Sequence, residues 1–167
     1  MIRDCGPADV PAIYEVINDG ASAYRGIIAT DCWHEPYMPR EELITELAAG
    51  VAFSGFFDGD ELAGVMGLQH VQDVALIRHA YTRTSQQRRG IGAKLLSHMR
   101  GRTERPILLG TWRSASWAIR FYEGQGFRLV SDDQIAPLLR RFWKIPDRQL
   151  HESVVMGDAR WFARSHA

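Results

Sequence analysis

The stretch Gln87-Arg88-Arg89-Gly90-Ile91-Gly92-Ala93-Lys94-Leu95-Leu96 lies between two segments with different patterns of apolar residues. The segment before it, 74–82, is apolar enough to form a buried or half-buried strand. In the segment that starts at Ile91, the side chains of Ile91, Leu95 and Met99 share one face of a helix. The sequence therefore predicts a strand, a short loop that contains glycine, and a helix that begins at the loop.

This loop has the features of an anion site. The N–H groups of a first helical turn have no intrahelical partner, and the helix dipole places partial positive charge there. Gly90 and Gly92 do not block the approach of a ligand, and they permit backbone angles closed to other residues. Arg88 and Arg89 add positive charge. We therefore predict a site for a phosphate or pyrophosphate group.

Two common phosphate motifs do not fit the loop. It is not a P-loop, because no Gly-Lys-Ser/Thr follows the glycines. It is not a dinucleotide fingerprint, because Leu95 stands where the third glycine is required. The loop resembles instead the Q/R-x-x-G-x-G/A signature of the GNAT acyltransferase superfamily, filled here by Gln87, Gly90 and Gly92. Taken alone, the loop also fits an ordinary helix N-terminus that contains glycine.

A second stretch strengthens the resemblance. Residues 115–123 are expected to form a helix, Gly124 and Gly126 end it, and residues 127–130 form a strand. This stretch resembles the GNAT signature A-x-x-F-Y-x-x-x-G-F, filled by Ala118, Phe121, Tyr122, Gly126 and Phe127. The two signatures stand in the family's order with one strand between them, and the resemblance covers roughly residues 1–156. One departure is Ala115, where the family often has an asparagine that contacts the CoA arm; Ser114 is polar but one position away.

The remaining chain fits the same fold. Apolar spacing and turn residues predict helices over 7–20, 41–49, 91–102 and 115–123, and strands over 1–5, 51–57, 61–71, 73–82, 106–112, 127–130 and 153–156. The resemblance implies a GNAT fold of mixed α/β class, with a twisted, mostly antiparallel sheet of about six to seven strands and about four helices. We expect one domain over 1–167, with 158–167 as a C-terminal tail. Segment 135–145 is expected to be a helical or loop excursion that either hangs over the acceptor site or fills the core.

Composition excludes several classes of function. Lys+Arg and Asp+Glu number 20 each, so charge gives no reason to expect nucleic acid or an anionic membrane as a partner. Cys5 and Cys32 make neither a disulfide framework nor a metal site, and Met38 replaces the second histidine of an H-E-x-x-H motif that His34-Glu35 would begin. No apolar run is long enough to span a bilayer, and no signal peptide is visible. We therefore expect a cytoplasmic protein without a metal.

Segment 21–39 is rich in aromatic and proline residues and has no clean period, which is typical of a binding loop. Tyr24, Trp33 and Tyr37 are its candidate substrate-binding residues; the alternative is that these aromatic side chains only cover the core. Trp161 and Phe162 suggest that the tail packs against another surface, and a homodimer is compatible with these two residues.

The resemblance implies acetyl-CoA as co-substrate and a loop that holds its pyrophosphate. The implied cofactor-binding residues are Ala80, Tyr81, Thr82, Gln87, Arg88, Arg89, Gly90, Ile91, Gly92, Ala93, Ser114, Trp117 and Tyr122. In this family the amine attacks the thioester directly, without a covalent enzyme intermediate.

Three catalytic tasks follow from that chemistry. The amine must lose a proton to a base or a water relay. A backbone N–H near Tyr81 and Thr82 is a candidate donor to the oxyanion. Tyr122 occupies the family's tyrosine position and is expected to protonate the leaving thiolate; the alternative is a core tyrosine whose hydroxyl is satisfied by backbone. His79 and Glu35 are rival bases, and a structural role for His79 is an alternative.

The leading hypothesis is an N-acetyltransferase that transfers an acetyl group from acetyl-CoA to a primary amine of a small molecule. Compact aromatic residues in segment 21–39 favour a small acceptor. A protein N-acetyltransferase is the alternative within the enzyme class, and a non-catalytic acyl-CoA sensor is the alternative outside it. If the resemblance does not hold, the loop predicts an α/β protein that binds ATP or NAD instead of CoA.

Overall fold

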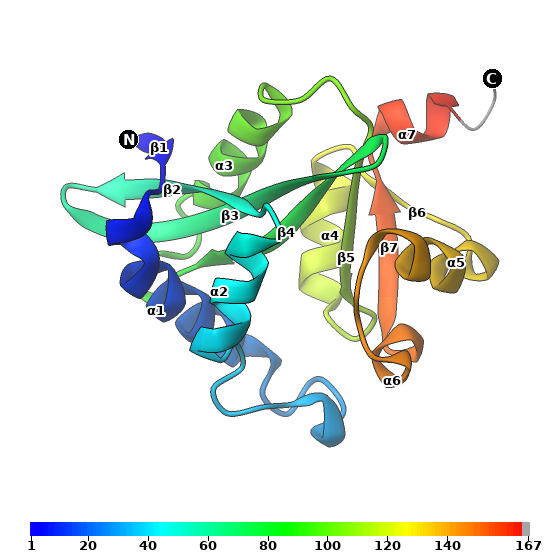
Figure 1. The fold of residues 1–167 in the computed structure, drawn as a ribbon, viewed down its shortest axis with the longest axis horizontal. Coiled ribbons are helices and arrows are strands. Elements are labelled where there is room, and N and C mark those ends of the chain that lie inside the picture. The colour runs from blue at the N-terminus through cyan, green and yellow to red at the C-terminus, as the bar shows by residue number, and fades with distance from the viewer. Residues whose placement is uncertain (165–167) are drawn as a thin grey trace. The chain divides into compact units, whose positions relative to one another are not determined.

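The structure is a computed structural model that describes residues 1–164, and its strands form a seven-stranded sheet in the order β1-β2-β3-β4-β5-β7-β6 (Figure 1). The strands are β1 (Ile2–Asp4), β2 (Ala52–Asp58), β3 (Glu61–Val71), β4 (Val74–Thr82), β5 (Ile107–Trp112), β6 (Arg128–Leu129) and β7 (Ser153–Gly157). The α-helices are α1 (Val10–Gly20), α2 (Arg40–Ala48), α3 (Ile91–Arg100), α4 (Ser116–Gly124), α5 (Asp132–Phe142), α6 (Asp147–His151) and α7 (Ala159–Arg164). The predicted α/β class is confirmed, and α5, α6 and α7 add to the four predicted helices.

The chain divides into two compact units, which we describe separately. The first unit contains residues 1–23, 34–70 and 77–104. The second unit contains residues 24–33, 71–76 and the chain from 105 onward. Strand β4 contributes residues to both units, and the aromatic segment 21–39 is also divided between them.

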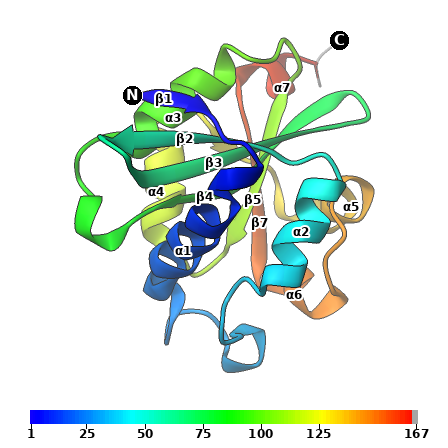
Figure 2. The same ribbon diagram turned by 60° about the vertical axis from the view of Figure 1, so that its left-hand side comes forward.

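The β2–β3 hairpin is the centre of the first unit. The turn between its strands is Gly59-Asp60, in which Gly59 has the left-handed φ of 62° that favours glycine. β1 pairs with β2 in antiparallel register, with Ile2 opposite Phe56. Helices α1 and α2 pack on this hairpin (Figure 2). One core cluster contains Ile13, Ile17 and Leu43 of these helices together with Phe53 and Val65 of the sheet. The apolar face that the helical spacing creates on α1 is therefore buried.

Two details of this unit were settled by packing. Ile44 is apolar, but its exposed fraction is 54%. Leu43 is its neighbour on α2 and is fully buried, and adjacent positions on a helix point in different directions. Helix α3 packs against the hairpin so closely that a Cβ on Gly64 would lie 2.7 Å from Cγ2 of Ile91. Gly64 therefore determines how near α3 lies to β3.

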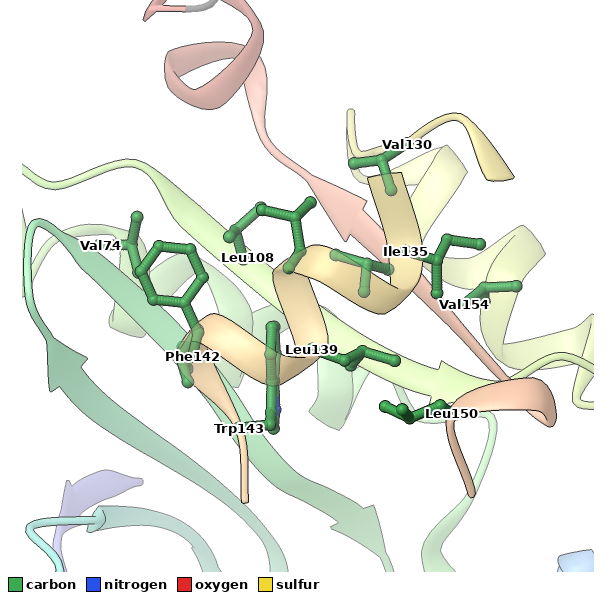
Figure 3. Close-up of a cluster of buried hydrophobic side chains, with 12 residues drawn as sticks. Val74, Leu108, Val130, Ile135, Leu139, Phe142, Trp143, Leu150 and Val154 are labelled. Carbon is green, nitrogen blue, oxygen red and sulfur yellow. The ribbon is translucent and has the colours of Figure 1, made fainter. Parts of the chain in front are cut away.

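The second unit is built around the antiparallel pair β5 and β7, with Leu109 opposite Met156. Helix α5 lies on this pair and supplies Ile135, Leu139 and Phe142 to a buried cluster with Leu108 and other side chains (Figure 3). The segment expected at 135–145 is therefore a helix over most of its length, and its apolar face fills the core of this unit.

The predicted tail begins with a helix that is attached to the second unit. The Asp158 carboxylate accepts hydrogen bonds from the backbone N–H groups of Ile107 (3.1 Å) and Trp161 (3.0 Å), and so it joins β5 to the start of α7. Trp161 and Phe162 pack against the core cluster of this same unit. The two side chains that suggested a subunit contact thus have an intramolecular role, while residues 165–167 of the predicted tail lie outside the described chain.

Within residues 1–164, no helix combines the length and the apolar character that a bilayer crossing requires. The same residues contain no cluster of three or more His, Cys, Asp or Glu side chains that could hold a metal ion.

Candidate functional site

The predicted anion loop connects β4 to α3 in the first unit. β4 ends at Thr82, a short 3-10 turn follows over Thr84–Gln86, and α3 begins at Ile91. Gly90 is the residue before the helix and has a φ of 74°, in the left-handed region. Arg88 has a φ of 64°, which is uncommon for a residue with a side chain. Two left-handed residues within three positions turn the chain sharply into the helix. Glycine adopts this φ without cost, whereas the conformation of Arg88 is strained, and such strain is typical of functional loops.

The first turn of α3 presents unpaired backbone donors. Within the described chain, the N–H groups of Ile91, Gly92 and Ala93 donate to no acceptor in the loop or in a side-chain cap, and the N–H of Lys94 is the first that donates to a carbonyl, that of Gly90 at 3.1 Å. Three such donors, together with the positive end of the helix dipole, fit a phosphate or pyrophosphate group. The residues present therefore fit the phosphate part of a CoA molecule.

The two arginines of the loop differ in their surroundings. Arg89 donates to the Asp58 carboxylate at 2.8 Å and also contacts Gln86, so its side chain is tied to the β2–β3 turn. Arg88 is exposed and forms no ion pair or hydrogen bond within residues 1–164, and Gln87 is likewise exposed and unpaired there. Arg88 is therefore the loop side chain that remains available to an anionic ligand.

Contacts from distant residues hold the loop in place. The Asp19 carboxylate accepts hydrogen bonds from the backbone N–H of Thr84 at 2.7 Å and from its hydroxyl. Arg83 donates from Nε to the carbonyl of Leu62 at 2.8 Å. A Cβ on Gly20 would lie 3.0 Å from the carbonyl oxygen of Thr82, so glycine lets the end of α1 approach the end of β4. Asp19 was not among the predicted site residues, because its role depends on a contact 65 positions away.

His79 lies on β4 with a φ of 53°, the left-handed region, and this irregularity was not predicted. Its Nε2 lies 2.7 Å from Oε2 of Glu46 on α2. Arg78 Nη2 lies 2.6 Å from the same carboxylate oxygen, and Arg78 Nη1 donates to Gln69 at 2.9 Å. The His79 ring also stacks on Phe53, with ring centroids 6.2 Å apart. Neighbouring strand residues normally point to opposite faces, and here both reach one carboxylate.

This cluster is mostly buried and its charges are balanced. The exposed fractions of the side chains are 15% for Arg78, 15% for His79 and 18% for Glu46. Burial alone would raise the pKa of Glu46, but the hydrogen bond from His79 and the charge of Arg78 lower it below its ordinary value. Burial lowers the pKa of Arg78, and Glu46 and Glu42 oppose that change. Glu46 is thus ionised at neutral pH.

The other predicted residues at the end of β4 are half-buried. Tyr81 meets Tyr37 edge to face, with ring centroids 6.4 Å apart, and so the structure brings one predicted substrate residue to one predicted cofactor residue. Ala80 and Thr82 are half-buried on the same strand. Glu35, the rival base, is an exposed residue.

In the second unit, Tyr122 lies on α4 with an exposed fraction of 8%. Its ring meets Phe121 and Phe127 edge to face, at centroid distances of 5.0 and 5.7 Å. Burial raises the pKa of Tyr122 well above its ordinary value, and the nearby Tyr24 raises it further. The hydroxyl accepts or donates no hydrogen bond within residues 1–164, and so the backbone partner expected of a purely structural tyrosine is not found there.

The remaining predicted residues of this unit form an aromatic cluster. Tyr24 stacks on Trp117, with centroids 5.9 Å apart and planes at 30°, and meets Trp112 edge to face at 6.5 Å. Trp33 carries the guanidinium of Arg25 over its ring at 5.3 Å. Tyr24 is thus brought to the predicted cofactor residue Trp117. The predicted cofactor residue Ser114 is exposed, and Ala115, the departure from the family pattern, is fully buried.

Neither cysteine has the environment of a nucleophile. Burial raises the pKa of the half-buried Cys5 thiol to about 11, and burial raises the pKa of the Cys32 thiol as well. A thiol needs a lowered pKa to react as a thiolate at neutral pH. The structure therefore offers no activated thiol within residues 1–164 to carry an acyl group.

Comparison with known proteins agrees with this geometry. A family model described as an acetyltransferase (GNAT) domain matches residues 14–140. The PaiA N-acetyltransferase from Thermoplasma acidophilum, solved in complex with coenzyme A, has a TM-score of 0.70 and 21% identity over 95% of this chain and 97% of that chain. A GNAT-family acetyltransferase from Staphylococcus aureus Mu50 has a TM-score of 0.69 and 19% identity over 95% of this chain and 97% of that chain. The ribosomal-protein-S18-alanine N-acetyltransferase from Escherichia coli has a TM-score of 0.68 and 18% identity, over 95% and 92% respectively.

No curated protein matches the chain. At these identities the solved structures establish a shared fold, whereas the family model spans most of the chain and includes both signature stretches. The chain therefore belongs to the GNAT acetyltransferase family, and acetyl-CoA is the acetyl donor that this membership implies.

Proposed function

We propose that the protein transfers an acetyl group from acetyl-CoA to a primary amine of a small molecule, by direct attack of the amine in a ternary complex. The observation that carries this proposal is the open first turn of α3, whose three unpaired N–H groups and nearby Arg88 suit a pyrophosphate. The equal numbers of acidic and basic residues, 20 each, support a small acceptor over a strongly charged protein segment.

The properties of the two cysteine thiols favour direct attack of the amine over a cysteine-bound acetyl intermediate. The raised pKa values of Cys5 and Cys32 make a cysteine-bound acetyl intermediate unfavourable at neutral pH. Intact-protein mass spectrometry after incubation with acetyl-CoA alone tests this point. We expect no mass gain of one acetyl group, and a gain that an added amine then removes would indicate a covalent intermediate.

Each chemical task has a candidate group. We assign deprotonation of the amine to His79, with Glu35 as the rival base, and stabilisation of the oxyanion to a backbone N–H near Tyr81 and Thr82. We assign the proton for the leaving thiolate to Tyr122. Its raised pKa keeps the hydroxyl protonated at neutral pH, and its hydroxyl has no hydrogen bond to give up within residues 1–164.

The predicted binding residues complete the proposal. Gln87 to Ala93 would hold the pyrophosphate through backbone N–H groups, with Arg88 as the free cationic side chain. Trp117 and Ser114 of the second unit are proposed to contact the CoA arm. Tyr24, Trp33 and Tyr37 are proposed to contact the acceptor, because aromatic rings supply apolar surface and can attract a cationic amine.

The test is calorimetric titration with acetyl-CoA, followed by a panel of small amines and amino-terminal peptides while free thiol is measured. We expect acetyl-CoA to bind, and one or more small amines to cause thiol release. Release with peptides only would indicate a protein N-acetyltransferase. Binding without release from any acceptor would favour an acyl-CoA sensor, and binding of ATP or NAD in place of acetyl-CoA would refute the assignment of the loop.

A further inference from the structure

The Glu46 carboxylate accepts from two consecutive residues of β4, and this arrangement requires an irregular strand. In a regular strand Arg78 and His79 would point to opposite faces. The positive φ of His79 changes the direction of the chain at this point, and both side chains reach Oε2 of Glu46, at 2.6 and 2.7 Å. Uncommon backbone conformations persist where the surroundings hold them, and they concentrate at functional sites.

The contact fixes which ring nitrogen of a neutral His79 carries the proton. Glu46 is ionised and can therefore only accept a hydrogen bond. At 2.7 Å from its oxygen, Nε2 of His79 must be the donor. In a neutral imidazole the other nitrogen, Nδ1, then has the free electron pair.

Nδ1 is also open to a proton. It has no hydrogen-bond partner within residues 1–164. Among those residues, the one side-chain nitrogen or oxygen that is both sealed from solvent and unpaired is Nε2 of His98, so Nδ1 of His79 keeps contact with solvent. The nitrogen of the ring without a partner is thus not sealed from solvent.

We infer that Glu46 is a positioning residue that holds His79 as the Nε2–H tautomer and so makes Nδ1 the base of the acetyl transfer. This inference rests on the proposed function. It assigns a role to Glu46 on α2, and it favours His79 over Glu35 as the base.

Side chains from α2, β2 and β3 surround the pair formed by Arg78 and His79. Arg78 and His79 both contact Oε2 of Glu46. Glu42 on α2 acts on Arg78, Gln69 on β3 accepts from it, and Phe53 on β2 contributes an apolar face to the His79 ring.

The proton balance is complete. Nδ1 of His79 takes one proton from the ammonium form of the acceptor and later releases it to solvent. The neutral amine then forms the new C–N bond as the C–S bond of the thioester breaks. As the C–N bond forms, the nitrogen loses its second proton. This proton balances the one that Tyr122 gives to the thiolate. The products are the acetylated amine, CoA as a thiol, and one proton in solution.

The first experiment measures the tautomer, and it does not depend on activity. Ring ¹⁵N shifts of histidine distinguish the Nε2–H, Nδ1–H and doubly protonated forms. The signal of His79 among the six histidines is assigned from the spectrum of His79→Gln. We expect the Nε2–H form above neutral pH in the wild type and a mixture of tautomers in Glu46→Gln. An Nδ1–H form in the wild type, or an unchanged spectrum in Glu46→Gln, would overturn the inference.

The second experiment measures whether Glu46 acts through His79. We expect Glu46→Gln and His79→Gln each to lower kcat by about tenfold or more, with the Kd for acetyl-CoA changed by less than about twofold. Because both changes remove the same function, we expect Glu46→Gln to cost less than about twofold more in the His79→Gln background. The matched control is Glu42→Gln, which removes a charge one turn earlier on α2 and leaves His79 untouched.

The outcomes separate this inference from the proposed function. If Glu46→Gln lowers kcat equally with and without His79, Glu46 has another role and the inference fails although the transferase stands. If no amine causes thiol release in the wild type, the proposed function fails, and with it the role of Nδ1 as base. The tautomer measurement then decides separately whether Glu46 positions the ring.

Discussion

The anion loop and the Glu46–His79 contact lie in the same unit but are built in different ways. The loop presents consecutive backbone N–H groups, and its geometry depends on left-handed residues at positions 88 and 90. The Glu46–His79 contact joins side chains 33 positions apart and depends on the placement of α2 over the sheet. A local backbone motif can be identified from its own residues, whereas a side-chain contact between distant elements cannot.

This difference has consequences for mutation. A backbone site tolerates changes of side chain except those that fill the space, change the charge or strain the φ angle. A side-chain contact is lost when either partner is replaced. We therefore expect loop variants to change acetyl-CoA affinity, and variants of catalytic side chains to change kcat. The following predictions test that division, from the largest expected effect to the smallest.

Gly92→Asp gives the strongest test of the loop. The new carboxylate lies in the first turn of α3. The positive end of the helix dipole stabilises it there, but it repels a pyrophosphate. We expect the Kd for acetyl-CoA in calorimetry to rise by about 100-fold or more, which corresponds to about 2.8 kcal/mol, without loss of thermal stability. Gly92→Ala is the control, with a change of less than about threefold. Wild-type affinity in Gly92→Asp would place the pyrophosphate elsewhere.

Tyr122→Phe tests a side chain that was identified from a local motif, as the loop was, but that is proposed to act in catalysis and not in binding. We expect kcat to fall by more than about tenfold, because the thiolate loses its proton donor, while the Kd for acetyl-CoA stays within about twofold. Since the pKa of Tyr122 is raised, ionisation of its hydroxyl should not reduce wild-type kcat anywhere below about pH 10. Tyr14→Phe on α1 is the matched control. If Tyr122→Phe keeps wild-type turnover, this assignment is wrong.

Arg88→Ala and Arg89→Ala compare a free and a paired arginine within the loop. We expect Arg88→Ala to weaken acetyl-CoA binding by about fivefold at low salt, with a smaller effect as salt screens the charge. Arg89 is already paired with Asp58, so Arg89→Ala should change affinity by less than about twofold. Titrations at two salt concentrations measure both. An equal effect of the two substitutions would contradict the distinction drawn from their contacts.

Cys5→Ala should have no measurable effect on turnover. The pKa of the Cys5 thiol is raised from 9.0 to about 11, so the thiolate fraction at pH 8 falls from about one in ten to about one in a thousand. We therefore expect iodoacetamide at pH 8 to label Cys5 about 100-fold more slowly in the folded protein than in the unfolded chain. Rapid labelling, or loss of turnover in Cys5→Ala, would reopen the question of a thiol intermediate.

Much of the fold followed from local patterns. The sequence Asp58-Gly59-Asp60 is typical of the turn between β2 and β3, and apolar spacing predicted α1 and α3, because these signals act between residues close in the chain. The burial of Leu43 in preference to Ile44 did not follow, since both fit an apolar face and the sheet beneath α2 decides between them. The helical form of 159–164 also depended on distant contacts, with Asp158 joined to Ile107.

The candidate site shows the same division. Gln87, Gly90, Gly92 and Tyr122 were identified from two short motifs. Asp19 and Glu46 were not, because an acidic residue on a helix has no distinctive pattern until its partner is known. Alternation in a regular strand places His79 and Tyr81 on one face, and it gives no indication of the positive φ at His79.

The sequence by itself determined the α/β class, the order of most elements and the position of an anion loop before α3. These properties depend on hydrophobic periodicity and on glycine conformations, which are encoded over a few residues. The tertiary structure alone decided that Asp19 holds the loop and that Glu46 meets both Arg78 and His79. A hydrogen bond between side chains that are far apart in sequence needs a fixed distance and direction, and only the packing of helices on the sheet supplies them.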